Sequence, residues 1–144
     1  MIEMLKNRKE ALQKRGVKGF TLMEMLIVIA IIAVLVAIAI PVLGAQLDRS
    51  KDAADEANAR SAYALIQADA MSPAKSGGMP KASFASGKLT VTLSDGSSQT
   101  FEFSDRTDTV TVTDPITGPE DVKVTLKHKD TNIPDVVFGT YESA

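Results

Sequence analysis

The chain has 144 residues, 44% of them hydrophobic, and a net charge of −2, which suits one small domain with one further element. It contains no cysteine, which excludes a disulfide framework and any cysteine-based metal site. Residues 1–19 carry a charge of +4, which leaves −6 for residues 20–144, and this acidic remainder argues against a nucleic-acid-binding surface.

The polar, basic segment 1–19 comes first. Its composition predicts a leader peptide that is later removed, and not a folded element. A basic arm is retained on the cytoplasmic side of a membrane by the positive-inside bias. Gly16 and Gly19 flank Val17 and Lys18, so the end of the arm is predicted to be open to a protease.

An apolar run follows over residues 20–47, and residues 25–40 contain no polar side chain. A helix of roughly 20 apolar residues crosses the hydrocarbon core of a bilayer. The run therefore predicts a single-pass segment in the cell membrane, with the N-terminus in the cytoplasm. Pro41 and Gly44 predict a kink or a loosening of this helix.

Residues 48–72 are predicted to continue the same helix as an amphipathic half, because alanine is frequent and both glycine and proline are absent up to Pro73. The two halves together would span about 50 residues, or roughly 75 Å. The predicted packing stripe consists of Leu47, Ala54, Ser61, Leu65 and Ala68.

The remaining segment, 73–144, predicts a loop and then an antiparallel sheet. After a loop over residues 72–83 the pattern alternates apolar and polar side chains. Strands are expected at 88–94, 99–104, 109–113 and 122–127, with a possible fifth at 136–141. Their apolar face would consist of Leu89, Val91, Leu93, Phe101, Phe103, Val110, Val112, Val122, Val124 and Leu126. The amphipathic half of the helix would cover this face, which makes an α+β fold.

One acidic residue, Glu24, stands near the start of the apolar run. A carboxylate inside a bilayer costs about 2.5 kcal/mol or more near the centre, so it indicates a functional site with a partner. Cleavage after Gly19 would give Phe20 a free α-amine in the same layer. That amine could pair with Glu24 within one helix or between neighbouring subunits.

The sequence Lys18-Gly19-Phe20-Thr21-Leu22-Met23-Glu24, followed by the apolar run with Pro41, closely resembles type IV pilins and their relatives. The resemblance implies cleavage between Gly19 and Phe20 by a prepilin peptidase, methylation of Phe20 and a role for Glu24 in assembly. It also implies a homopolymeric filament on the cell surface, built by an assembly ATPase and an inner-membrane platform protein. Two features depart from many pilins: the absence of cysteine and the length of the leader.

Two alternatives stay open. The chain could be a pseudopilin of a type II secretion or competence DNA-uptake system, or a membrane-anchored surface binding domain that does not polymerise. No pattern predicts an enzyme, a cofactor or a metal site. His128, the only histidine, is expected to be solvated at a strand end. The acidic residues Asp105, Asp108, Asp114, Glu120 and Asp121 are expected to be solvated in loops, because they lack the spacing of a calcium loop.

Overall fold

The structure is a computed structural model that describes residues 1–14, 21–73 and 78–139. It divides into a unit of residues 1–43 and a unit of residues 44–144, called the C-terminal unit below. The helices are α1 (Ile2–Lys14) and α2 (Leu22–Met71), and Pro119–Asp121 forms the short 3-10 helix η1. The strands are β1 (Lys81–Ala85), β2 (Lys88–Thr92), β3 (Ser98–Glu102), β4 (Thr107–Val112), β5 (Lys123–His128) and β6 (Val136–Gly139). The α+β fold is confirmed.

The helix α1 corrects the expectation that the leader has no folded element. Ile2–Lys14 consists of residues such as methionine, leucine, lysine and glutamate, which favour helix, and the first glycine comes only at Gly16. The basic composition that identified the leader carries no information against helix formation. A leader and a helix are therefore compatible over the same residues.

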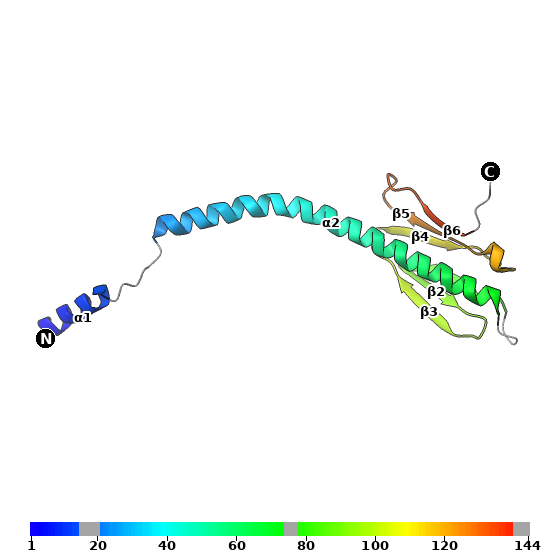
Figure 1. Ribbon diagram of the computed structural model, residues 1–144, viewed down its shortest axis with the longest axis horizontal. Coiled ribbons are helices and arrows are strands. Elements are labelled where there is room, and N and C mark those ends of the chain that lie inside the picture. The colour runs from blue at the N-terminus through cyan, green and yellow to red at the C-terminus, as the bar shows by residue number, and fades with distance from the viewer. Residues whose placement is uncertain (15–20, 74–77, 140–144) are drawn as a thin grey trace. The chain divides into compact units, whose positions relative to one another are not determined.

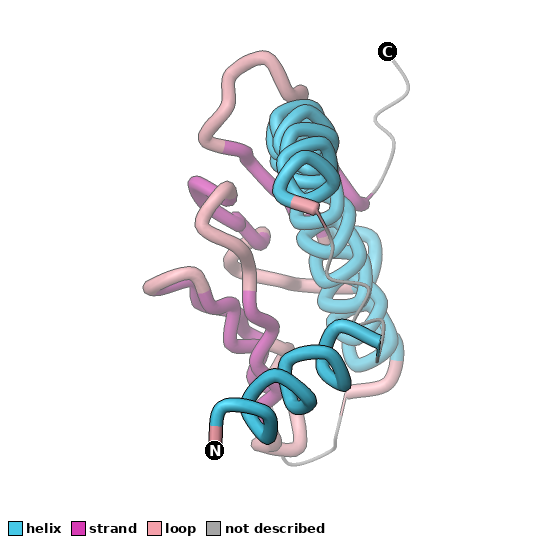
Figure 2. Tube along the Cα trace, turned by 90° about the vertical axis from the view of Figure 1, so that its left-hand side faces the viewer, coloured by secondary structure: helices cyan, strands magenta, loops and turns pink. Residues whose placement is uncertain are grey.

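The strands form two sheets where the sequence predicted one antiparallel sheet. The sheet β1-β2-β3 and the sheet β4-β5-β6 are each three-stranded and antiparallel, and β1 also approaches β4. In Figure 1, β2 and β3 are drawn below the C-terminal half of α2, and β4 to β6 above it. Figure 2 shows most of the strands gathered on one side of that half of the helix.

The strand β1 lies partly where the sequence predicted a loop. It joins β2 through Ser86 and Gly87, which have φ angles of 52° and 73°, and Ala85 pairs with Lys88 across this turn. Positive φ at both central residues is the geometry of a two-residue type I′ hairpin. The Ser-Gly pair is the turn signal that could have revealed this strand.

The core lies between α2 and the two sheets. All ten residues predicted for the apolar face of the sheet are either in the buried core or packed against it. Of the stripe predicted on the helix, only Leu65 packs against the core among the described residues, and the other four residues are exposed. The buried side chains of α2 are Asp55, Ala59, Ala62, Ile66 and Ala70. Alanine occurs on every side of this half of the helix, so apolar periodicity alone could not identify the packed face. Small side chains on that face let the helix lie close to the sheets.

Gly139 in β6 offers a test of how closely the strands pack. A Cβ atom there would lie 2.7 Å from the Val122 carbonyl oxygen and 2.9 Å from the Lys123 Cα, and φ is +145°. Gly139→Ala should therefore lower the free energy of unfolding by about 1–3 kcal/mol, measured by urea denaturation. Gly78→Ala is the matched control, since a Cβ at Gly78 meets no atom within 4 Å. Equal stability of the two variants would contradict the tight β5–β6 contact.

Candidate functional site

The N-terminal turn of α2 is capped by two side chains, Thr21 and Glu24. The Thr21 backbone N–H donates to Glu24 Oε2 at 2.8 Å, and the Thr21 hydroxyl donates to the same oxygen at 3.1 Å. In return, Thr21 Oγ1 accepts the Glu24 backbone N–H at 3.2 Å. This reciprocal pattern is a capping box, in which N-terminal N–H groups without helical partners are satisfied by side chains.

The cap gives Glu24 a structural role that the sequence analysis missed. The Thr-x-x-Glu spacing just before an apolar run was the signal that could have revealed it. A carboxylate that accepts hydrogen bonds loses less free energy on leaving water than a bare one. Gly19 and Phe20, the residues predicted to flank the cleavage site, lie outside the described residues. Their cleavage, the methylation of Phe20 and its pairing with Glu24 stay predictions.

The first half of α2 exposes an apolar surface on all sides. An 18-residue window in this helix has a mean hydropathy of 3.4 with none of it buried, and the helix is long and apolar enough to cross a membrane. An uncovered apolar surface of this extent is typical of a segment covered by lipid or by other chains. Pro41 and Gly44 both lie inside α2, and the kink expected there stays a prediction. The large exposed side chains are Leu22, Met23, Met25, Leu26, Ile27, Val28, Ile29, Ile31, Ile32, Val34, Leu35, Val36, Ile38, Ile40, Val42, Leu43 and Leu47.

The second half of α2 is fixed to the sheets through aspartates, for which the sequence analysis predicted no role. Asp55 is only 2% exposed. It accepts hydrogen bonds from the Ser104 N–H at 2.8 Å, the Ser104 hydroxyl at 2.5 Å and the Thr107 hydroxyl at 2.7 Å. Asp69 accepts from the Ser94 N–H at 2.8 Å and the Ser94 hydroxyl at 2.7 Å. Both carboxylates therefore join the helix to loops that follow strands of the first sheet.

A third aspartate, Asp52, forms an ion pair with Arg106. The Arg106 Nε and Nη2 donate to the two oxygens of Asp52 at 2.8 Å and 3.2 Å, and Asp48 lies 3.3 Å from the same guanidinium. His128 is 5% exposed, which corrects the expectation of a solvated residue. Its Nδ1 is 3.8 Å from Asp52 Oδ1 and has no hydrogen-bond partner among the described residues. The alternation of β5 places His128 on the same inner face as Val124 and Leu126.

The Asp52–Arg106 pair predicts a pH dependence. Hydrogen bonding from Arg106 holds the pKa of Asp52 below its ordinary value, against the opposing effect of burial. A depressed folded-state pKa contributes stability above the unfolded pKa of about 3.9, and that stability is lost as the pH falls through the folded value. Urea unfolding between pH 6 and pH 2 should therefore show a steeper loss of stability for the wild type than for Asp52→Asn. Parallel curves for the two proteins would exclude this contribution.

Metal binding finds no support in the described part of the chain, where no group of three or more histidine or acidic side chains could hold an ion. Asp108 lies in β4 and not in a loop, whereas Asp105, Asp114, Glu120 and Asp121 lie outside the strands. All five of these acidic residues are exposed. They do not converge on one another as calcium ligands would.

Comparison with known proteins adds one finding. Residues 14–40 match the sequence profile of the prokaryotic N-terminal methylation motif. The matched residues include Thr21, Glu24 and most of the uncovered half of α2. No curated protein and no solved structure matches the chain.

Proposed function

We propose that the chain is a type IV pilin-like protein, a structural subunit of a type IV pilus or related filament, because residues 14–40 match the prokaryotic N-terminal methylation motif. A prepilin peptidase removes residues 1–19 and exposes the amine of Phe20, which is then methylated. The mature chain polymerises through its N-terminal helix. An assembly ATPase and an inner-membrane platform protein drive this step.

The observation that carries the proposal is the uncovered apolar half of α2, which begins at a capped acidic residue. Before assembly, the bilayer covers this surface, with the N-terminus in the cytoplasm. After assembly, equivalent helices of other subunits cover it, so apolar burial is retained when the helix leaves the membrane. The repeated head-to-tail contact generates an open helical polymer outside the cell, and not a closed ring.

The charge of Glu24 sets the stagger between subunits. A carboxylate and an amine that meet in an apolar layer stabilise one another, whereas a wrong register leaves a buried charge without its partner and costs about 3–5 kcal/mol. The Thr21 cap keeps the carboxylate at the helix N-terminus, next to the position where the new amine forms. Glu24 therefore caps its own helix and can also pair with the amine of a neighbouring subunit.

A pseudopilin of a type II secretion or competence system is the second candidate, since it would use the same processed leader, acidic residue and apolar helix. The absence of cysteine favours it over a pilin with a disulfide-closed C-terminal loop. Electron microscopy of sheared cell-surface material distinguishes long pili from a short pseudopilus. A non-polymerising membrane anchor is the candidate of another class, and it gives Glu24 no role beyond the cap.

Processing is the first test. When the chain is produced with a prepilin peptidase, intact-mass measurement should give a product that begins at Phe20 and carries one added methyl group. Without the peptidase, the product should retain residues 1–19. A chain that keeps its leader in the presence of an active peptidase would exclude the filament proposal and favour the simple anchor.

A further inference from the structure

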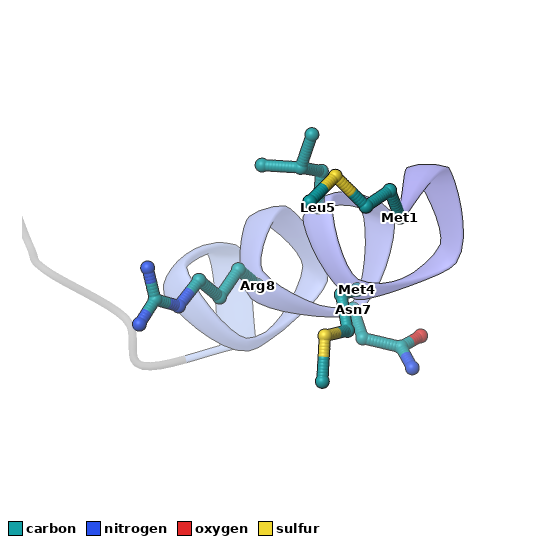
Figure 3. A pocket seen from close by; sticks show the side chains of 5 residues that line it. All are labelled: Met1, Met4, Leu5, Asn7 and Arg8. Atoms are coloured by element: carbon teal, nitrogen blue, oxygen red, sulfur yellow. The ribbon is translucent and has the colours of Figure 1, made fainter.

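The leader helix α1 has an uncovered apolar stripe. Met1, Met4, Leu5 and Arg8 follow the spacing i, i+3, i+4 and i+7, which places them along one face of a helix. Figure 3 shows Met1 and Leu5 on one side of this face, Met4 and Asn7 on the other, and Arg8 toward the C-terminal end. These side chains line a shallow surface hollow, and Met1, Met4 and Leu5 are more than half exposed. The stripe therefore lacks a cover within the described structure.

The charged side chains are unevenly distributed around the same helix. Glu3 and Glu10 lie two turns apart on one face, and Glu3 is rotated by roughly 200° from Met1. Arg8 lies within the apolar stripe and Lys9 lies at its edge, whereas Lys6, rotated by roughly 140° from Met1, lies near the glutamates. Two basic side chains are therefore next to the surface that would cover the stripe. Both glutamates point to the opposite side. This distribution is complementary to an anionic surface and unfavourable for a cationic one.

The chain connection limits where α1 can be. Six residues lie between Lys14 and Thr21, and the seven Cα-to-Cα steps that join them span at most roughly 25 Å. If α2 enters the membrane as proposed above, α1 stays within reach of the cytoplasmic headgroups, and this inference rests on that part of the proposed function. The cytoplasmic leaflet carries anionic lipids.

We propose that α1 lies flat in the cytoplasmic membrane surface, with Met1, Met4 and Leu5 among the acyl chains and Arg8 and Lys9 on anionic headgroups. The long arginine side chain reaches from the apolar stripe to the headgroup layer. The segment with the predicted cleavage site is then held at the interface from both sides, by α1 before it and by the apolar half of α2 after it. The leader thereby acts as a surface anchor as well as a removable peptide.

The test uses the absence of tryptophan in the chain, so that one introduced tryptophan is the sole indole fluorophore. The full-length precursor carries Leu5→Trp and is reconstituted in nanodiscs of phosphatidylglycerol and phosphatidylcholine, or of phosphatidylcholine alone. Brominated lipids should quench Leu5→Trp at least threefold more in the anionic discs. Arg8→Gln with Lys9→Gln, added to Leu5→Trp, should remove this difference between the two lipids.

Two further variants make the outcomes separable. Glu3→Trp lies on the opposite face, and its loss of a negative charge would only strengthen attraction to lipid, so weak quenching there is a stringent control. Val36→Trp reports whether the apolar half of α2 is in the bilayer. Strong quenching at position 36 without quenching at position 5 overturns the proposal that α1 is a surface anchor, but leaves the membrane stage of the proposed function intact. A protein partner that covers α1 in place of lipid would give this same result. Absence of quenching at position 36 overturns both the anchor and the membrane stage of the proposed function. Equal quenching at positions 3 and 5 overturns the orientation of the helix.

Discussion

Asp55→Ala should strongly destabilise the C-terminal unit. The carboxylate is buried and accepts hydrogen bonds from the Ser104 N–H, the Ser104 hydroxyl and the Thr107 hydroxyl. Hydrogen bonds to a charged group contribute about 1.5–3 kcal/mol each, and removal of the acceptor leaves buried donors without a partner. The expected loss is roughly 3–5 kcal/mol, out of the 5–15 kcal/mol that stabilise an ordinary domain.

The measurement is urea unfolding of a chain that begins at Gly44, because the whole buried core lies beyond that residue. Glu56→Ala is the matched control on the adjacent position of α2. Its carboxylate is 45% exposed and, among the described residues, forms an ion pair with Arg60 one turn along, so the expected loss is below about 0.5 kcal/mol. Similar losses for the two variants would mean that the buried aspartate does not fix the helix to the sheets.

Asp55→Asn separates charge from shape. The amide oxygen can accept from the Ser104 N–H while the amide nitrogen donates to the Ser104 and Thr107 hydroxyls, so these partners stay paired and only the negative charge is lost. We expect an intermediate loss of about 2–3 kcal/mol. Stability equal to the wild type would show that the negative charge contributes nothing at this position.

The aspartates explain why the packed face of α2 was not predictable from apolar periodicity. Asp55, Ala59, Ala62 and Ile66 lie on one face, but alanine on the other faces gives the same hydrophobic signal. The choice between faces depends on hydrogen bonds to Ser104 and Thr107, which are about 50 residues away in the sequence. Long-range contacts of this kind are not encoded in a local pattern.

Other parts of the fold were predictable because their signals are local. The long helix follows from an unbroken run of helix-favouring residues, and the apolar face of the sheets follows from strict alternation in segments such as Lys88–Thr92. The division into two sheets was not predictable, since alternation defines a strand and its faces but not its neighbours. At the candidate site, Glu24 was predictable as a functional residue because it is a charged residue in an apolar run. Its role in the helix cap was predictable only from its spacing to Thr21.

Glu24 is the residue whose replacement should have the largest effect on assembly. Glu24→Ala removes both the cap and the charge, so the Phe20 amine of a neighbouring subunit would be buried without a partner. The cost of about 3–5 kcal/mol corresponds to a loss of more than a hundredfold at equilibrium. We expect the variant to be processed and to keep a folded C-terminal unit, while its amount in sheared filaments falls at least tenfold relative to the membrane pool.

Glu24→Gln distinguishes the two roles of this side chain. Glutamine also completes a capping box, so its amide oxygen can accept from the Thr21 N–H and hydroxyl. Glutamine carries no charge, so the Phe20 amine of the neighbouring subunit would lack an ionic partner, as it would in Glu24→Ala. If charge pairing sets the register, filament incorporation of Glu24→Gln should be as low as that of Glu24→Ala. The control is Met25→Leu, a volume-conserving change at the next residue, which should be incorporated normally. Normal incorporation of Glu24→Gln would reduce the role of Glu24 to that of a helix cap and would remove the physical basis of the proposed stagger.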